Sequence, residues 1–243
     1  MSEASRLHGV SIVMPVFNLE ESISESIDRT VDALQNLDNL EIIIVDDGST
    51  DATRTEAQSA AIQHPQVTVI GHTPNRGKGA ALQAGFEKSR GTIVVFLDGD
   101  LDIPPEQVPT FVETLIDSGV DALVGTKKRA MEPGRYPLMR RALSKIFSGT
   151  IRLLFRLPVS ETQTGLKAFK RETLSDVLPN LRVVRYTYDL ELIIYLHRRG
   201  HHIKEIPVQL AEGASSRGVS IRTLWEMGSD TLRIWARTVL FRR

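Results

Sequence analysis

Three aspartates stand on alternate positions directly after an apolar run, in the segment VVFLDGDLDIPPE. Asp98 and Asp100 flank a glycine, which gives the backbone freedom for a tight turn that brings two carboxylates together. Such carboxylates repel each other, and one takes up a proton unless a cation is present. Mg²⁺ and Mn²⁺ prefer oxygen ligands, which they commonly share with substrate phosphates. The pattern therefore predicts either a metal site or a solvated turn with acidic residues before a helix.

A second acidic pair favours the metal site. Asp46 and Asp47 end the β-rich run LEIIIVDDG, just as Asp98 and Asp100 end the run TIVVFL. In open α/β sheets, ligands bind beyond the carboxyl ends of the strands. Because both acidic groups fall where a strand ends, we expect their side chains to reach this crevice rather than the core.

The elements that must position these groups alternate along the first half of the chain. Apolar runs rich in β-branched residues are separated by segments with helical spacing of apolar residues, which is typical of a parallel sheet covered on both faces. We predict an α/β fold with a mostly parallel sheet flanked by helices. The predicted strands are 9–17, 40–48, 67–72, 92–100 and 120–126. The predicted helices are 21–37, 52–64, 78–91 and 104–119.

The second half is basic and more helical. A basic amphipathic helix is predicted over 135–157, a helix over 188–200, a strand over 202–210 and a long helical pattern over 220–243. The chain has no internal repeat and no low-complexity linker. We therefore expect one catalytic domain, residues 1–220, followed by a C-terminal amphipathic helix, residues 221–243.

Composition excludes several other classes of protein. Lys+Arg and Asp+Glu number 30 each, so the net charge argues neither for nor against nucleic acid, and we expect no nucleic acid as a partner. With no cysteine, disulfides and thiolate metal sites are excluded. The N-terminal residues lack the apolar stretch of a secretory signal, and no run is long enough to span a bilayer. The sequence also lacks the P-loop pattern, since NRGKGAALQAG has no GK[ST].

The segments VSIVMPVFN, IIIVDDGSTDAT, NRGKGAALQAGF and VVFLDGDLDIPPE, in this order, resemble the N-terminal half of family 2 glycosyltransferases with the GT-A fold. The second half resembles the polyprenyl-phosphate sugar transferases, namely dolichol-phosphate mannose synthases and dolichyl-phosphate glucosyltransferases. That likeness is carried by GTKKRA, RRALSKIFS, ETQTGLKAFKRE and YDLELIIYLHRRGHHIKEIPV. The resemblance extends over nearly all of the chain from residue 9.

The resemblance implies a nucleotide-sugar donor, either UDP-glucose or GDP-mannose, a Mg²⁺ or Mn²⁺ cofactor and inversion at the anomeric carbon. The donor contacts that it implies are Pro15, Phe17, Val45, Asp47, Arg76, Asp98, Gly99, Asp100 and Arg217. The metal ligands that it implies are Asp98, Asp100 and Asp102. The catalytic group is completed by Lys127, which stands where the family usually has arginine, and by Arg140 and Ser144, which match a basic patch for the acceptor phosphate.

The sequence departs from the family pattern at several positions. Leu19 replaces an acidic residue, Glu161 stands for an aspartate and Leu166 for a phenylalanine. The C-terminal element around Arg217 matches loosely in EGASSRGVSIR. These differences leave the sugar and the closing loop open.

Acceptor chemistry separates two hypotheses. A sugar hydroxyl needs a general base, whereas a lipid phosphate is already an anion at pH 7 and needs positive charge to hold it. The basic residues Arg140, Arg141 and Lys145, with Ser144, supply that charge unless they form a solvated helix face. We predict hexose transfer to polyprenyl phosphate. The alternatives are a hydroxyl acceptor on a soluble or cell-wall glycan and a non-catalytic nucleotide-binding module.

The basic helices also suit a membrane surface. Leucine, isoleucine, phenylalanine and tryptophan interleave with arginine in both the 135–157 segment and the last segment, a pattern typical of helices in the headgroup layer. We predict peripheral association with the cytoplasmic membrane face. The alternative is a helix packed on its own core or on a second copy in a homo-oligomer. Asp189 and Glu191 are expected to pair with arginine rather than to hold the acceptor, and His201 and His202 to lie in a loop before a strand.

Overall fold

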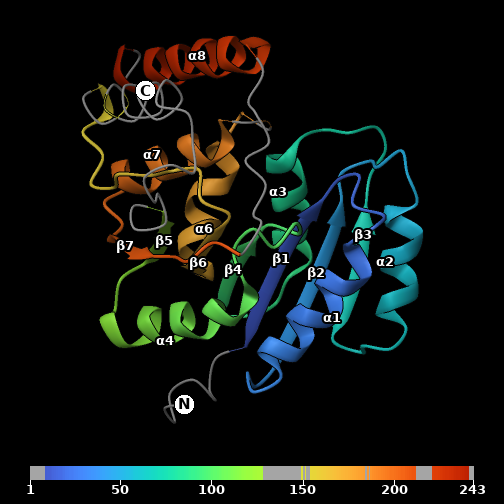
Figure 1. The fold of residues 1–243 in the computed structure, drawn as a ribbon. Helices are drawn as coiled ribbons and strands as arrows, with labels where there is room; N and C mark the ends of the chain where they lie inside the picture. Colours follow the sequence, from blue (N-terminus) through green and yellow to red (C-terminus); the bar gives the residue numbers. More distant parts are fainter. Residues whose placement is uncertain are drawn as a thin grey trace.

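The computed structural model describes residues 9–127, 149, 151, 154–183, 185, 187–211 and 221–240, with the backbone given for 221–227, 239 and 240. Within them, seven strands form one mixed sheet with helices on both faces (Figure 1). The spatial order is β3-β2-β1-β4-β6-β5-β7. The strands are β1 Val10–Val16, β2 Leu40–Asp46, β3 Val67–Gly71, β4 Ile93–Leu97, β5 Ala122–Thr126, β6 Leu166–Lys170 and β7 Ile203–Pro207.

The predicted mostly parallel sheet is confirmed. β1 runs parallel to both β2 and β4, so the carboxyl ends of these strands meet at one edge of the sheet. One strand was absent from the prediction: β6 lies antiparallel between β4 and β5. Its five residues, LKAFK, carry two lysines, and Lys167 is nonetheless buried. The short, charged segment gave no strand signal because its burial depends on a partner far away in the sequence.

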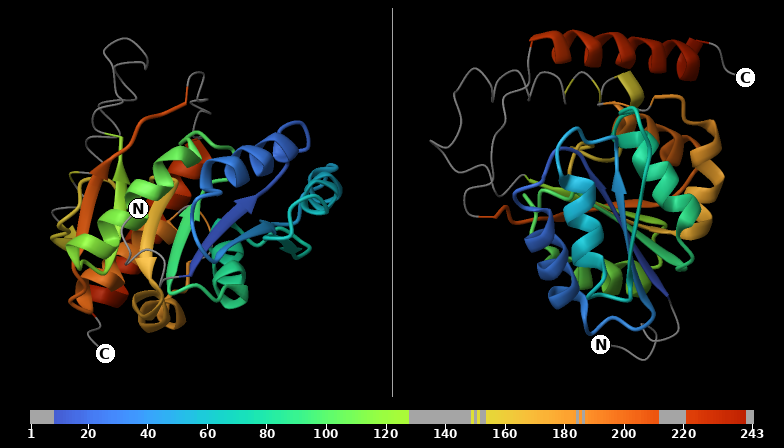
Figure 2. Two further views of the ribbon diagram at one scale, coloured as in Figure 1. Left: turned by 90° about the horizontal axis from the view of Figure 1, so that it is seen from below. Right: turned by 90° about the vertical axis from the view of Figure 1, so that its right-hand side faces the viewer.

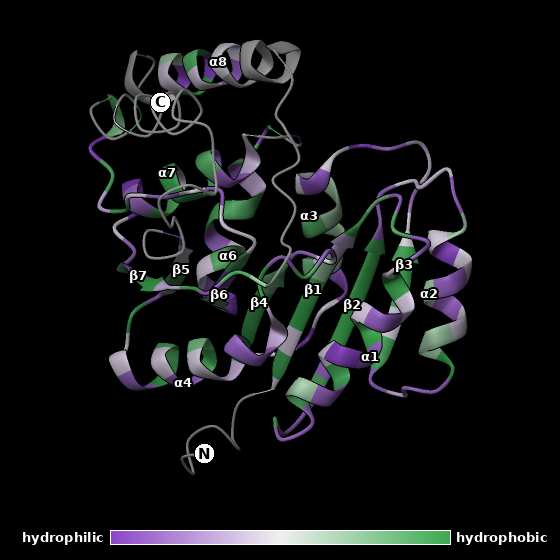
Figure 3. Ribbon diagram, viewed as in Figure 1, coloured by the Kyte–Doolittle hydropathy of each residue, from purple (hydrophilic) through white to green (hydrophobic). Residues whose placement is uncertain are grey.

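The sheet separates two hydrophobic cores. Ile12 and Met14 of β1 face one core, whereas Val13 between them faces the other, as the alternation of side chains along a strand requires. Figure 3 shows the apolar strands enclosed between helices whose outer surfaces are hydrophilic. The helices on the first face are α1 Ile23–Leu34, α2 Thr53–Ala61 and α4 Val108–Ser118. Those on the second face are α3 Lys78–Lys88, α6 Arg171–Val177 and α7 Tyr188–Arg198.

The C-terminal helix α8, Ile221–Trp235, continues as a π-helical turn, η4 Ala236–Leu240. It lies across the end of the molecule toward which the parallel strands point (Figure 2). Buried Glu191 of α7 accepts a hydrogen bond from Arg237 Nη2 at 2.7 Å, which confirms the predicted pairing with arginine. None of the helices in the described ranges is long and apolar enough to cross a membrane. The predicted helix over 135–157 falls largely outside those ranges.

Candidate active site

A cleft of about 170 Å³ opens where β1 and β4 end. The two strands are parallel neighbours, so the residues that follow each of them converge on the same point. The lining residues are Pro15, Val16, Phe17, Leu19, Asp47, Lys78, Asp98, Gly99 and Asp100. The cleft thus brings together the acidic turn after β4, the end of β1 and the start of α3.

The turn after β4 holds its two carboxylates in one place. The backbone N–H of Asp98 donates to the Gly165 carbonyl at 3.0 Å, which continues the pairing of β4 with β6. The N–H of Asp102 donates to Asp100 Oδ1 at 3.2 Å and closes the turn. Burial, with the neighbouring charge of Asp98, raises the pKa of Asp100 above its usual value. A cation at this turn would relieve the repulsion between the two carboxylates.

The structure adds a cation that the sequence analysis did not single out. Lys78 Nζ lies 2.6 Å from Asp98 Oδ1 and 3.6 Å from Asp189 Oδ2. Burial alone would lower the pKa of Lys78, but the charges of Asp189 and Asp98 outweigh it and the pKa is raised. Lys78 is therefore a charged ammonium group at the wall of the cleft.

A buried ion pair lies behind Lys78. Lys167 Nζ is 2.7 Å from Asp189 Oδ1 and also donates to the Thr164 carbonyl at 2.6 Å. Burial would raise the pKa of Asp189, but the charges of Lys167 and Lys78 lower it, so this carboxylate stays ionised. Asp189 pairs with two lysines rather than with the arginine that the sequence predicted. A line of alternating charges thus runs from the core to the cleft.

Two local signals in the sequence point to Lys78. It is the first residue of α3, where the partial positive charge of the helix N-terminus disfavours a cation. It also follows a glycine, Gly77, the residue type that readily adopts a positive φ; in the structure this φ is 103° and the chain turns into the helix there. A lysine in so unfavourable a position calls for nearby carboxylates, although neither signal identifies which ones.

The Asp47 carboxylate fixes the loop that precedes α3 and Lys78. Its carboxylate is buried and accepts hydrogen bonds from His72 Nε2 at 2.7 Å and Asn75 Nδ2 at 2.9 Å. The backbone N–H groups of Arg76 and Gly77 also donate to it, at 2.9 Å and at 3.0 to 3.1 Å. These bonds fix the residues directly before α3. Asp47 lines the cleft, but much of its hydrogen-bonding capacity is taken up within the protein.

The remaining predicted site residues are not all in the cleft. Val45 is fully buried in the core between the sheet and α3. Neither Arg76 nor Lys127 is among the lining residues: the side chain of Arg76 is exposed, and the backbone N–H of Lys127 donates to Glu161 at 2.7 Å. The predictions for Arg140, Ser144 and Arg217 lie outside the described residues.

The carboxylates of the cleft suit a divalent cation only if a bound phosphate supplies further oxygen ligands. In the part of the chain that the structure describes, no three His, Asp or Glu side chains gather as a metal site. Asp98 and Asp100 nevertheless provide the oxygen ligands that Mg²⁺ and Mn²⁺ prefer, and Asp98 already holds the ammonium group of Lys78. Mg²⁺ sites commonly combine one or two carboxylates with substrate phosphates and water.

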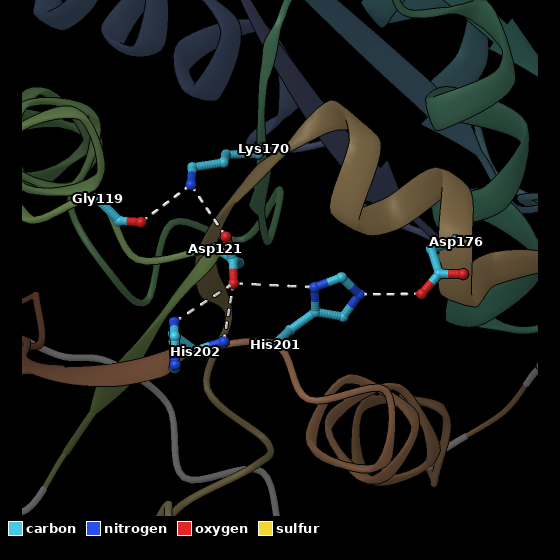
Figure 4. Close-up of polar contacts among 6 residues, drawn as sticks. All are labelled: Gly119, Asp121, Lys170, Asp176, His201 and His202. Carbon is cyan, nitrogen blue, oxygen red and sulfur yellow. Dashed lines mark hydrogen bonds and ion pairs between the residues drawn. The ribbon is translucent and has the colours of Figure 1, made fainter.

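A second polar cluster lies at the opposite edge of the sheet, where β5 and β7 begin (Figure 4). Asp121 accepts hydrogen bonds from Lys170 Nζ and from the His202 N–H, both at 2.9 Å. The ring of His201 lies between Asp121, at 3.8 Å, and Asp176, at 3.0 Å. The two histidines precede β7, which confirms the predicted loop before a strand. This cluster joins elements and takes no part in the cleft.

Comparison with known proteins agrees with this geometry. Residues 11–178 match the sequence model described as "Glycosyl transferase family 2". The chain belongs to this family. The matched region includes the ends of β1, β2 and β4, the acidic turn and Lys167. The family resemblance predicted from the sequence motifs is therefore confirmed.

Two relatives in family 2 illustrate the similarity. The chain is 29% identical over 238 residues to "Dolichyl-phosphate beta-glucosyltransferase ALG5A" of Trichomonas vaginalis, covering 93% of this chain and 72% of that protein. It is 32% identical over 216 residues to "Dolichol-phosphate mannosyltransferase" of Pyrococcus furiosus, covering 87% of this chain and 58% of that protein. Another similar protein, "Glycosyltransferase AglD" of Haloferax volcanii, is covered over 37% of its length. The chain thus spans between about a third and three quarters of these relatives.

The fold of this family 2 chain also matches solved structures. Glucosyl-3-phosphoglycerate synthase from Mycobacterium tuberculosis, in a complex with Mn²⁺, UDP and phosphoglyceric acid, aligns with a TM-score of 0.74. The alignment covers 96% of this chain and 79% of that one at 23% sequence identity. The predicted GT-A fold is therefore confirmed.

Proposed function

We propose that this glycosyltransferase moves a hexose from a nucleotide-sugar donor to a polyprenyl phosphate, with inversion and with a divalent metal. The observation that carries the proposal is the cleft at the ends of β1 and β4, where Asp98, Asp100 and Lys78 meet on a family 2 fold. Relatives named for transfer involving dolichyl phosphate and dolichol phosphate support the acceptor class.

The donor is assigned to this cleft. Phe17 is 43% exposed at its wall and offers an aromatic face on which a nucleobase can stack. Pro15 and Gly99 lie beside it and add no bulky side chain to the lining. Gly99 has no room for one, because an added Cβ would collide with Val16. UDP-glucose and GDP-mannose are the two donors that this proposal includes.

The metal is assigned to Asp98 and Asp100, with Asp102 as the third predicted ligand. Mg²⁺ or Mn²⁺ bound there supplies Lewis-acid stabilisation of the departing diphosphate. The protein's own contribution is to hold both carboxylates at the end of β4 and to keep a lysine beside them. The M. tuberculosis neighbour, whose structure contains Mn²⁺ and UDP, supports this assignment.

A phosphate acceptor suits the described lining better than a hydroxyl. Of the three carboxylates in that lining, Asp47 is hydrogen-bonded within the protein and Asp98 is paired with Lys78. Asp100 belongs to the pair assigned to the cation, which leaves no carboxylate of the described lining as a dedicated general base. A phosphate nucleophile needs no such base. Arg140 and Ser144 are proposed to hold the acceptor phosphate, and Lys127 to help to stabilise the departing diphosphate.

The protein is proposed to act at the cytoplasmic face of a membrane, with which it associates peripherally. None of the described helices is long and apolar enough to span a membrane. Helix α8 lies across the end of the molecule toward which β1 and β4 point (Figure 2), and the cleft opens where these two strands end. We assign residues 1–220 to catalysis and 221–243 to contact with the lipid surface, with a second copy of the chain as the alternative contact.

Transfer assays with defined acceptors test this function. Radiolabelled UDP-glucose or GDP-mannose is offered with Mn²⁺ and either solubilised polyprenyl phosphate or a sugar alcohol. We expect a lipid-soluble product whose anomeric configuration, read by NMR, is inverted. Asp98→Asn should reduce the rate roughly 100-fold or more, because metal stabilisation of the leaving group is worth several kcal/mol.

Asp117→Asn is the matched control, since Asp117 is an exposed aspartate at the end of α4. It should transfer at the wild-type rate. Turnover with the sugar alcohol alone would move the assignment to a hydroxyl acceptor. Full activity of Asp98→Asn, or of the wild type in EDTA, would overturn the metal-dependent reaction.

A further inference from the structure

The Asp98 carboxylate already has a cationic partner in the protein. Lys78 Nζ is 2.6 Å from Asp98 Oδ1, at the position where the proposed function needs a metal ligand. The Lys78 side chain is 32% exposed and lines the cleft, so its ammonium group is accessible to ligands. A metal ion bound to the Asp98 carboxylate would lie close to this ammonium group, and two cations at so short a distance repel each other.

Asp189 offers Lys78 a second place. Its Oδ2 atom is 3.6 Å from Lys78 Nζ, while its Oδ1 atom is held by Lys167. The side chains of Asp189 and Lys167 are 8% and 2% exposed, so this pair is a fixed part of the interior. An ammonium group that leaves Asp98 therefore remains beside a buried carboxylate rather than losing every partner.

The backbone of Lys78 is fixed, so the exchange is a movement of its side chain. Asp47 holds the N–H groups of Arg76 and Gly77 just before α3. On the other side Gly79 packs against the ring of Tyr188, where an added Cβ would lie 2.6 Å from Cγ. The backbone at the start of α3 is thus fixed on both sides of Lys78. The long side chain of Lys78 can still change rotamer.

We propose that Lys78 and the divalent cation compete for Asp98, and that this competition makes metal binding and nucleoside diphosphate binding depend on each other. The inference rests on the proposed function. A metal ion that binds alone must break the close ion pair between Lys78 and Asp98. A metal ion that binds with a diphosphate brings a new anion for the released ammonium group. Each ligand therefore strengthens the other, and by linkage the two effects are equal.

The test measures Mn²⁺ binding directly, by the EPR signal of free Mn²⁺, without nucleotide and with UDP or GDP. In the wild type we expect weak Mn²⁺ binding that UDP or GDP strengthens by about tenfold, within the range typical of coupled sites. Lys78→Met should bind Mn²⁺ alone about fivefold more tightly and show a smaller coupling, because only the part that comes from direct contact between phosphate and metal remains. Lys78→Arg keeps a cation and should stay close to the wild type.

Lys88→Met is the matched control, because it removes a lysine from the opposite end of α3. It should leave both the Mn²⁺ affinity and the coupling unchanged. Thermal unfolding checks that each variant folds, and Lys78→Gln replaces Lys78→Met if the methionine variant does not. Wild-type Mn²⁺ affinity and wild-type coupling in Lys78→Met, or in Lys78→Gln where that variant replaces it, would overturn the competition and leave the proposed function standing. A wild type that binds no Mn²⁺ even with nucleotide would overturn both.

Discussion

At the scale of single residues, the site depends on Gly165, whose lack of a side chain leaves room for the Asp98 carboxylate. Gly165 lies directly against the Asp98 side chain, and an added Cβ would lie 2.5 Å from Asp98 Oδ2. The carbonyl of Gly165 also accepts the Asp98 N–H at 3.0 Å. Gly165, which directly precedes β6, therefore leaves space beside Asp98 Oδ2. Lys78 binds the other oxygen of this carboxylate, Oδ1.

Replacing this glycine should separate activity from stability. Gly165→Ala would push the Asp98 carboxylate aside, and we expect transfer to fall about 10- to 100-fold, because small displacements in a catalytic site have effects of this size. The melting temperature should change little, since the Asp98 side chain is 36% exposed and its carboxylate can shift toward solvent. Asp117→Asn, at the exposed end of α4, is the control for transfer rate. Unchanged activity in Gly165→Ala would show that the position of Asp98 is not critical.

The location of the carboxylates at the strand ends was predictable from the sequence, whereas the ion pairs of the site were not. Asp98 and Asp100 follow an apolar strand, and this local pattern placed them correctly at the sheet edge. Lys78 and Asp189 lie more than a hundred residues apart in the sequence, and their approach depends on how α3 and α7 pack. Charge pairing over such a separation leaves no periodic signal in the sequence.

At the scale of elements, the prediction succeeded where burial follows a simple period. β4 is apolar throughout and β1 and β2 are mostly apolar, because both faces of a central parallel strand are covered, so each was predictable from its own residues. β6 was not, since its buried Lys167 is tolerated only through Asp189 on α7. Tertiary pairing overrides local pattern most strongly where a charge is buried.

The junction of β5, β6 and β7 gives a pH-dependent prediction. Burial would raise the pKa of Asp121, but hydrogen bonds from the His202 N–H and from Lys170 lower it, with His201 contributing charge. An aspartate whose folded pKa is depressed adds stability above its unfolded pKa, about 3.9, and loses it as the pH falls through the folded value.

We therefore expect Asp121→Asn to lower the free energy of unfolding by about 1 kcal/mol at pH 7. The difference from the wild type should begin to shrink below about pH 4, where the carboxylate of the unfolded chain becomes protonated, and should be lost as the pH falls through the lower pKa of the folded state. Urea denaturation over this pH range measures both quantities. Asp117→Asn, on an exposed helix end, should show no such trend. A difference that stays constant down to pH 3 would assign the stabilisation to the hydrogen bonds rather than to the charge.

At the scale of the whole molecule, the proposed chemistry and the proposed lipid contact share one end. The carboxyl ends of the parallel strands, which form the cleft, point toward the end across which α8 lies (Figure 2). On α8, Thr231, Ile234 and Thr238 of the helix and its continuation are buried against the protein, while Leu232 and Arg233 face outward. An exposed leucine beside an exposed arginine is the composition expected of a helix at a lipid headgroup layer.

Two exposed apolar residues allow this orientation to be tested. Leu232 is 63% exposed on α8, and Ile62 is 84% exposed at the end of α2. We expect Leu232→Glu to weaken co-sedimentation with phosphatidylglycerol–phosphatidylcholine vesicles about tenfold or more, because it removes roughly 2 kcal/mol of apolar burial and adds a charge that anionic lipids repel. Ile62→Glu makes the same chemical change away from α8 and should bind as the wild type does. Equal losses in both variants would mean that the lipid surface is not met by α8, and gel filtration of Leu232→Glu would then show whether this face instead joins two copies of the chain.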